Sequence, residues 1–236
     1  MTKLFATCTV LTVASLIILS CKKSSSTTTT PSSTSPTTST TSAPTVLFMI
    51  SNLFDNNTSN DSSAGASASP VSIIGSVSLG TVTLNSIDTL INSSGSYSSN
   101  TLLPVSGKPV WKISGGITAS AFSYTITKTI PHVENLHLSV SSFSKSSNLV
   151  LTHATITADT IKYTITDGAG VQVTKSVSGS ASGYTFIPST MTHLNAGSGA
   201  FIEVVGLTYE YSVQGGKNML FLNSSQYTKD NITINN

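Results

Sequence analysis

The densest group of potential metal ligands in the sequence is the segment His132-Val133-Glu134-Asn135-Leu136-His137. Zinc motifs of the His-Glu-x-x-His type place two histidines one helical turn apart on a shared face. Here His132 and Glu134 share one side of an extended chain, while His137 points to the other side. The spacing therefore predicts a polar linker. The segment Asp55–Asp61 offers oxygen ligands but lacks the glycine and the closing glutamate of a calcium loop, so it predicts a solvated loop. We expect no metal and no cofactor.

Acid pairs and nucleophiles are also sparse, with nine Asp and Glu in the whole chain. A glycosidase needs two carboxylates on either side of a sugar. Glu203 and Glu210 are seven positions apart, and an odd spacing puts them on opposite faces of a regular strand. The nearest run to a nucleophile elbow, residues 179–183, has Ala at the nucleophile position. We expect a protein that is not an enzyme, with a glycan-active hydrolase as the distant alternative.

Aromatic residues are the remaining candidates for ligand contact. Trp111, Tyr163, Tyr184, Tyr209 and Tyr211 could form a platform on which a sugar ring stacks, as in a carbohydrate-binding module, and Trp111, Tyr209 and Tyr211 are the candidates for ligand contact. Tyr209 and Tyr211 alternate with polar residues, however, and share a parity with Leu207 and Val213. That alternation favours a core face first. We keep the three aromatic residues as weak ligand-binding candidates.

Composition narrows the class of protein further. The chain has 236 residues, of which 44 are Ser and 36 are Thr, and its 11 basic residues are all Lys. Nucleic-acid recognition depends on clustered basic residues and on the fork of Arg, so we expect no nucleic-acid partner. Strand-favouring Thr, Val, Ile and Tyr are frequent, and no long stretch is rich in helix formers.

The N-terminus has the pattern of an export signal. Lys3 is followed by an apolar stretch, residues 4–19, which is short for a membrane span. The stretch ends in Ile18-Leu19-Ser20-Cys21, which resembles a bacterial lipobox. The resemblance implies that residues 1–20 are removed and that Cys21 carries lipid, palmitate among its acyl chains, which anchors the protein in a membrane. The only other cysteine, Cys8, lies in the removed segment. The exported protein would then have one cysteine and no partner for a disulfide, which favours acylation of Cys21.

Residues 21–45 are predicted to be a disordered tether. After Cys21 and two Lys, residues 24–45 contain 18 Ser or Thr among 22 positions and no large apolar residue. The Cys-Lys-Lys start and the Ser/Thr-rich tether resemble lipoproteins of Bacteroidota. That resemblance implies a lipid-anchored outer-membrane protein, and whether the domain faces the periplasm or the cell surface stays open.

The rest of the chain shows the period-two alternation of strands with one buried side. We predict strands near 147–156, 158–166, 171–178, 184–187, 200–213 and 217–234, a hairpin turn at 167–170, and a helical turn after Pro188 with a Ser cap. This order resembles immunoglobulin-like and fibronectin-III-like sandwiches.

Residues 46–132 read as a second β unit, with strands near 45–50, 71–74, 77–84, 108–114 and 121–128. Asn- and Ser-rich stretches at 55–69 and 92–101 interrupt it. The fold class is therefore all-β: an antiparallel, immunoglobulin-like β-sandwich, in two packed β units divided as 46–132 and 133–236. A single sandwich with an elaborated edge is the alternative.

Together these patterns predict a lipid-anchored cell-envelope protein with a non-catalytic binding or structural role. The membrane is its partner through Cys21, and a protein or a glycan would be its second partner. A carbohydrate-binding module is the close alternative.

Overall fold

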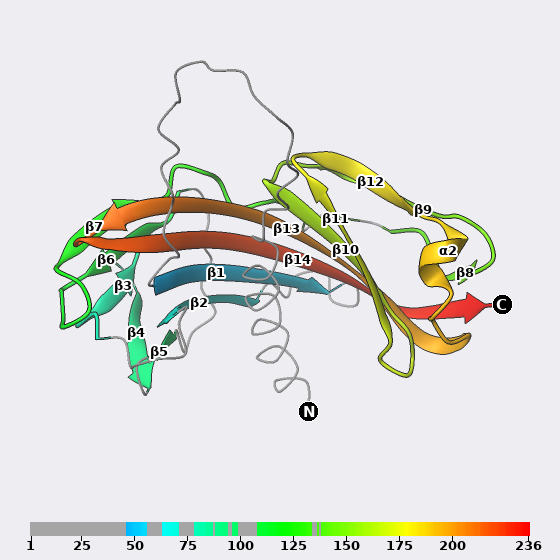
Figure 1. The fold of residues 1–236 in the computed structure, drawn as a ribbon, viewed down its shortest axis with the longest axis horizontal. Coiled ribbons are helices and arrows are strands. Elements are labelled where there is room, and N and C mark those ends of the chain that lie inside the picture. Colours follow the sequence, from blue (N-terminus) through cyan, green and yellow to red (C-terminus); the bar gives the residue numbers. More distant parts are fainter. Residues whose placement is uncertain are drawn as a thin grey trace, which may run out of the picture. The chain divides into compact units, whose positions relative to one another are not determined.

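The computed structural model describes residues 46–55, 63–70, 78–86, 88–93, 96–98, 108–133, 136 and 138–236. All of them belong to one compact unit of the chain, Ala43–Asn236. The described chain consists mainly of β-strands (Figure 1). The first strands are β1 (Val46–Asp55), β2 (Ser63–Pro70), β3 (Val82–Leu84), β4 (Asp88–Ser93), β5 (Ser96–Ser98), β6 (Val110–Ile113), β7 (Phe122–Thr125) and β8 (Ser142–Ser144). They are followed by β9 (Leu149–Ile156), β10 (Thr160–Thr166), β11 (Gln172–Ser178), β12 (Ala181–Phe186), the short helix α2 (Pro188–Met191), β13 (Gly197–Gln214) and β14 (Lys217–Asn235).

Most strands join one long sheet in the order β11-β10-β13-β14-β1-β2-β5-β4-β3-β6-β7, and β8 pairs with the end of β14. β9 and β12 form a separate antiparallel pair. The pairs β1–β14 and β8–β14 are parallel, and all the other described pairs are antiparallel. The predicted all-β class is confirmed, with these two parallel pairs as an addition to the antiparallel pattern.

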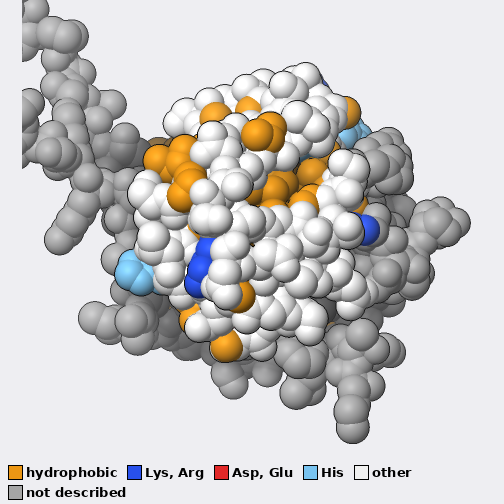
Figure 2. All heavy atoms as spheres, turned by 90° about the vertical axis from the view of Figure 1, so that its right-hand side faces the viewer, with side chains coloured by type: hydrophobic (Ala, Val, Ile, Leu, Met, Phe, Trp, Pro, Cys, Tyr) orange, Lys and Arg blue, Asp and Glu red, His pale blue; other side chains and the backbone are white. Residues whose placement is uncertain are grey.

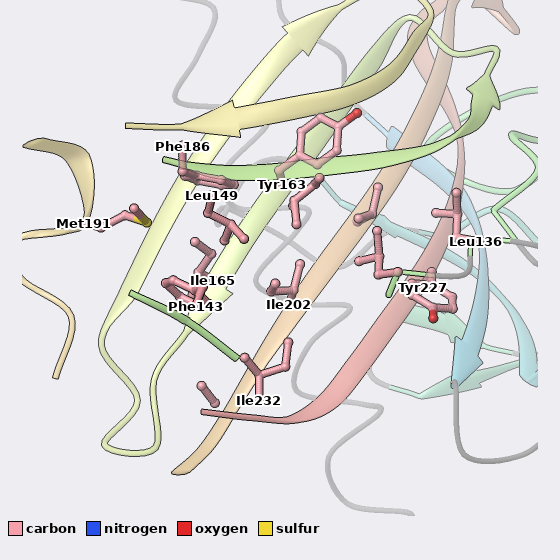
Figure 3. Packing of buried hydrophobic residues seen from close by; sticks show 14 of the residues in the cluster. Leu136, Phe143, Leu149, Tyr163, Ile165, Phe186, Met191, Ile202, Tyr227 and Ile232 are labelled. Atoms are coloured by element: carbon pink, nitrogen blue, oxygen red, sulfur yellow. The ribbon is translucent and has the colours of Figure 1, made fainter. Parts of the chain in front are cut away.

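A C-terminal cluster of buried side chains lies between two β layers (Figure 3). The pair β9–β12 contributes Leu149, Leu151, Ile156 and Phe186 to one side of it. The long sheet contributes Ile161, Tyr163, Ile165, Ile202, Val204, Tyr227, Ile232 and Ile234 to the other side. Burying two apolar faces against one another in this way is what defines a β-sandwich.

An N-terminal cluster forms around Trp111 and is built mainly from β3, β6, β7 and the start of β14. Its buried members are Leu79, Val82, Leu84, Leu90, Tyr97, Trp111, Ile113, Ala119, Ile126, Ile130, Met219 and Phe221. Tyr124 stacks on Phe221 with ring centroids 4.2 Å apart, which fixes β7 against β14. Along the segment between β7 and β8, the buried residues change from one cluster to the other: Ile130 belongs to the N-terminal cluster and Val133 to the C-terminal cluster. The division of the chain into two domains at residue 132 stays a prediction.

The hairpin β13–β14 serves both clusters. Its register is regular from Ile202↔Lys229 to Gln214↔Lys217. Val204 and Tyr227 face the C-terminal cluster, and Met219 and Phe221 face the N-terminal cluster, on the same side of the hairpin. We call the polar stretch between them the polar seam, and it consists of Gly206, Thr208, Asn223 and Ser225.

Segment 127–131 crosses the polar seam between β7 and β8. The Thr208 hydroxyl donates to the carbonyl of Thr129 over 3.0 Å, and Asn223 Nδ2 lies 3.4 Å from the carbonyl of Lys128. A Cβ built on Gly206 would lie only 2.7 Å from Pro131 Cβ, so the absence of a side chain at 206 admits the crossing segment. The segment that joins the two halves of the chain is thus fixed to the hairpin that both halves share.

The C-terminal strand predictions agree closely with β9 to β14, and the turn at 167–170 joins β10 to β11 as expected. The prediction that residues 55–69 only interrupt the sheet was wrong, because β2 begins at Ser63 and pairs with β1. The Asn- and Ser-rich stretch at 92–101 likewise contains β5. The Ser cap of α2 was also wrong: Ile187 is its N-cap residue, without a side-chain hydrogen bond, and Pro188 occupies the first turn.

Candidate functional site

The structure separates the three aromatic candidates. Trp111 is completely buried in the N-terminal cluster, where it pairs with Leu84 and Tyr124 on neighbouring strands. A ring with no exposed face has no surface to offer to a sugar. Its packing instead helps to hold β6 between β3 and β7 in the long sheet.

Tyr209 and Tyr211 lie on the face of β13 opposite the two clusters. Their ring centroids are 6.2 Å apart and their planes are nearly perpendicular, at 77°. Tyr211 is 46% exposed and Val213 is 67% exposed. The alternation predicted that Leu207, Tyr209, Tyr211 and Val213 face the core. Leu207 is buried as predicted, but Tyr211 and Val213 are exposed. We call Tyr209, Tyr211 and Val213 the tyrosine stripe, and its role in ligand binding stays a prediction.

The Lys128 side chain is held at the base of the tyrosine stripe. Its ammonium group lies 2.8 and 2.7 Å from the two carboxylate oxygens of Asp159 and donates to the carbonyl of Tyr209 over 3.1 Å. It also lies 5.5 Å from the centroid of the Tyr209 ring. Asp159 Oδ2 in turn accepts from the N–H of Tyr209 over 2.9 Å. The charges of Lys128 and Asp159 are thus used to fix segment 127–131 to β13.

Glu210 performs a similar task on the other face of β13. Its carboxylate accepts from the N–H of Lys128 and, at 2.8 Å each, from the hydroxyls of Tyr124 and Thr127. Burial on its own would raise the pKa of Glu210, but these hydrogen bonds outweigh it and lower the pKa below its ordinary value. A carboxylate held ionised by three donors is suited to anchoring a segment and poorly suited to giving or taking a proton.

Glu203 lies on the opposite face of β13 from Glu210, as the odd spacing predicts, because the register is regular between them. Gln226 Nε2 donates to Glu203 Oε2 over 2.7 Å. Burial raises the pKa of Glu203 to about 6, while the nearby Lys162 charge and the Gln226 hydrogen bond act in the lowering direction. The two glutamates cannot act on one sugar from either side, because the sheet itself separates them.

Asp167 is a carboxylate that sequence reasoning treated only as a turn residue. One of its oxygens accepts from the N–H groups of Ala169 and Val171, both at 2.9 Å. The other accepts from the N–H of Asn195 at 2.7 Å and from its side-chain amide at 2.9 Å. The hydrogen bond from the Asn195 N–H is the main cause of a lowered pKa of Asp167. Asp167 therefore closes the β10–β11 turn and ties it to the segment that precedes β13.

An aromatic row that includes the platform candidates Tyr163 and Tyr184 runs between the two layers of the C-terminal sandwich. Tyr163 stacks on His153 at 5.7 Å and on Tyr184 at 5.4 Å between centroids, and Tyr184 meets Phe186 edge to face at 4.9 Å. His153 Nδ1 lies 2.7 Å from the carbonyl of Ala154, which only accepts, so Nδ1 carries hydrogen, and His153 Nε2 shares a hydrogen bond of 2.8 Å with the Tyr163 hydroxyl. Tyr163 is fully buried, and burial raises its pKa to about 12. Alternation marked Tyr163 as a strand residue but could not show which rings it would meet.

A shallow depression of about 430 Å³ lies on the outer face of β3, β6 and β7. Thr83, Lys112 and Ser123 stand side by side across these strands and belong to its lining. Its lining offers hydroxyl groups and one ammonium group and contains no carboxylate. Ile113, Ala121 and Phe122 also line the depression, and most of its surface is apolar.

The remaining predictions concern residues outside the described part of the chain. Cys21 and the whole tether lie there, as do most of the Asp55–Asp61 segment and the residues Glu134 and His137. Among the described residues no group of three or more His, Cys, Asp or Glu could hold a metal ion. Within the same residues, no helix has both the length and the apolar character that crossing a bilayer would require.

Comparison with known proteins adds little to this picture. No protein-family model and no curated protein matches the chain. A solved structure described as "Biofilm associated protein - BSP domain" is similar at 14% identity and a TM-score of 0.24, over 80% of this chain and 30% of that chain. The chain thus spans less than a third of the length of that structure. The fold assignment rests on the strand pairing and the two layers described above.

Proposed function

We propose that this chain is a lipid-anchored protein of the cell envelope whose β-sandwich has a non-catalytic binding or structural role. The lipobox-like sequence ending in Cys21 supports the anchor, and the Ser/Thr-rich residues 24–45 support a tether that holds the sandwich away from the lipid. The outer membrane is the proposed site of attachment. A protein or a glycan of the envelope or its surroundings is the proposed contact.

The main support for a non-catalytic role is that three acidic side chains are occupied by hydrogen bonds within the fold. Asp159, Asp167 and Glu210 each accept hydrogen bonds from backbone N–H groups and join segments far apart in the sequence. Catalytic carboxylates need a free lone pair or a proton directed at a substrate. These three are committed to holding the fold. Figure 2 shows one face of the molecule, on which lysine and histidine side chains are visible and no acidic side chain is seen among the described residues.

The anchor is tested by protease shaving of intact and lysed cells that produce the chain, beside a Cys21→Ala variant. We expect the unaltered protein to fractionate with membranes and the variant to lose the membrane. Cleavage in intact cells would place the sandwich at the cell surface, and cleavage only after lysis would place it in the periplasm. A Cys21→Ala variant that stays bound to the membrane like the parent would refute the lipid anchor.

A carbohydrate-binding role is the second candidate, and the exposure of the tyrosine stripe favours it. Tyr211 and Val213 present apolar surface to solvent on one strand, with Tyr209 beside them. Aromatic side chains at such positions are the usual stacking surface for sugars. Affinity electrophoresis through gels containing soluble glycans would show retardation of the parent and loss of that retardation in Tyr211→Ala. Ile117→Ala is the matched control, because Ile117 is 97% exposed and lies outside the stripe. Equal mobility of the parent with and without glycan would remove this candidate.

A further inference from the structure

β11 is the outermost strand at one end of the long sheet, among the strands that the structure describes. It pairs with β10 over seven consecutive positions without a register shift, from Thr160↔Ser178 to Thr166↔Gln172. It contains no proline and no bulge. A regular edge strand of this kind carries a row of backbone groups that another strand can pair with, and proteins normally protect such an edge.

The inward row of β11 is interrupted by a charge at its centre. Val173 and Val177 pack against the C-terminal cluster, and Lys175 lies between them on the same face. In the register, Lys175 is opposite Tyr163, whose ring is fully buried. Period-two alternation would place a third apolar residue here. A lysine at this position is therefore a departure from the pattern that builds the rest of the core.

The charge of Lys175 would disfavour pairing of β11 with a second copy of β11 most strongly. Antiparallel pairing of two β11 strands with the greatest overlap places Lys175 opposite Lys175, with Val173 opposite Val177 on either side. Like charges directly opposite one another on a sheet repel. Extending the sheet would also cover the two ammonium groups and remove them from water. No ion pair joins Lys175 to another described residue, so no carboxylate among them neutralises this charge.

We propose that Lys175 keeps the β11 edge from pairing with a second copy of the chain. The substitution Lys175→Val makes the row from Val173 to Val177 apolar throughout and the centred antiparallel register self-complementary. The edge then becomes a dimerisation surface. Association of two copies through β11 does not depend on the proposed function.

The test measures the mass of the full chain, purified in one mild detergent buffer, by size-exclusion chromatography with light scattering over a series of concentrations. We expect the parent to keep a single-chain protein mass and Lys175→Val to reach twice that mass or more as concentration rises. Lys175→Glu, which keeps a charge at the centre of the row, should behave like the parent. Ser176→Val adds the same side chain to the outward face of the same strand and should also stay at single-chain mass.

A folding control separates association at the edge from general aggregation. Circular dichroism of Lys175→Val should show the parent's β spectrum, and Lys175→Thr provides a smaller strand-forming replacement if the valine variant does not fold. The proposal is overturned if folded Lys175→Val or Lys175→Thr keeps single-chain mass throughout. It is also overturned if Ser176→Val or Lys175→Glu associates to the same extent, or if the parent already associates through β11.

Discussion

Pro131 lies directly against Gly206, with the proline ring occupying the space that a side chain at residue 206 would fill. A Cβ at residue 206 would approach Pro131 Cβ to 2.7 Å and Ile156 Cγ2 to 3.2 Å. The two residues are far apart in the sequence and meet where segment 127–131 crosses the polar seam. This contact is one reason why a single hairpin can serve two hydrophobic clusters with a connecting segment laid across it.

Replacing Gly206 by Ala is expected to destabilise the protein by roughly 1–3 kcal/mol, the usual cost of overpacking a tight interior contact. Urea denaturation followed by circular dichroism measures the loss. The loss should be smaller in a Pro131→Gly background, because that change removes the atom nearest to the new methyl group. An equal loss in both backgrounds would show that Pro131 is not what residue 206 meets.

The polar seam supplies a matched pair of variants. Ser225 is fully buried and its hydroxyl has no hydrogen-bond partner among the residues whose side chains the structure describes, whereas the Thr208 hydroxyl donates to the carbonyl of Thr129. Ser225→Ala should leave the free energy of unfolding unchanged or raise it by about 1 kcal/mol, since a buried polar atom without a partner is costly. Thr208→Val should lower it by about 1–3 kcal/mol because it leaves the Thr129 carbonyl without its donor. Thermal or urea unfolding of the two variants side by side decides whether these signs are right.

Glu203 gives stability a dependence on pH. Burial raises its pKa from an ordinary value of 4.5 to about 6, so the folded state holds the proton more tightly than the unfolded state does. The cost of ionising Glu203 in the fold is absent below pH 4.5, appears as pH rises towards 6, and is complete above that. Glu203→Gln removes this cost and keeps an acceptor for Gln226.

We therefore expect Glu203→Gln to be more stable than the parent at pH 7 by about 2 kcal/mol, the free energy that corresponds to the difference between the two pKa values. The gain should vanish at pH 4. Urea midpoints at the two pH values measure it. A gain of the same size at both would mean that the variant acts through packing and not through the charge.

The ionised form of Asp167 stabilises the fold, which is the opposite of the effect of ionised Glu203. Its pKa is lowered chiefly by the hydrogen bond from the Asn195 N–H, so its ionised form stabilises the fold. This contribution is present above the ordinary pKa and is lost as pH falls through the lower pKa of the folded state. Asp167→Asn should lower the Tm by several degrees at pH 7 and by less in strong acid, as scanning calorimetry would show. A uniform loss across pH would assign the effect to the turn geometry alone.

The strands β10, β11 and β13 were predictable because each carries an apolar–polar alternation and is followed within two residues by glycine. β2 was not, because the residues that alternate with Ser and Gly in Ser63–Pro70 are Ala64, Ala66 and Ala68, which are too small to mark a buried face. It forms a strand by pairing with β1, a tertiary effect that no local pattern encodes. The three-residue strands β5 and β8 are too short to show any alternation.

The alternation of residues along β13 also could not predict which of the candidate tyrosines would be exposed. Tyr211 and Leu207 share one row of β13, yet Leu207 is buried and Tyr211 is 46% exposed. Which end of an 18-residue strand is covered depends on neighbours that come from elsewhere in the chain. The partners of Lys128 in β13 and at Asp159 are likewise 31 to 82 positions away and follow no spacing rule.

The shared hairpin sets an order for folding. β13 and β14 follow every other strand in the chain, yet Met219 and Phe221 complete the N-terminal cluster and Ile202, Val204 and Tyr227 complete the C-terminal one. Both clusters therefore stay incomplete until the residues of β13 and β14 have been synthesised. Neither half of the β structure can finish its core before the other half's shared hairpin is available, and both cores are completed by the same pair of strands.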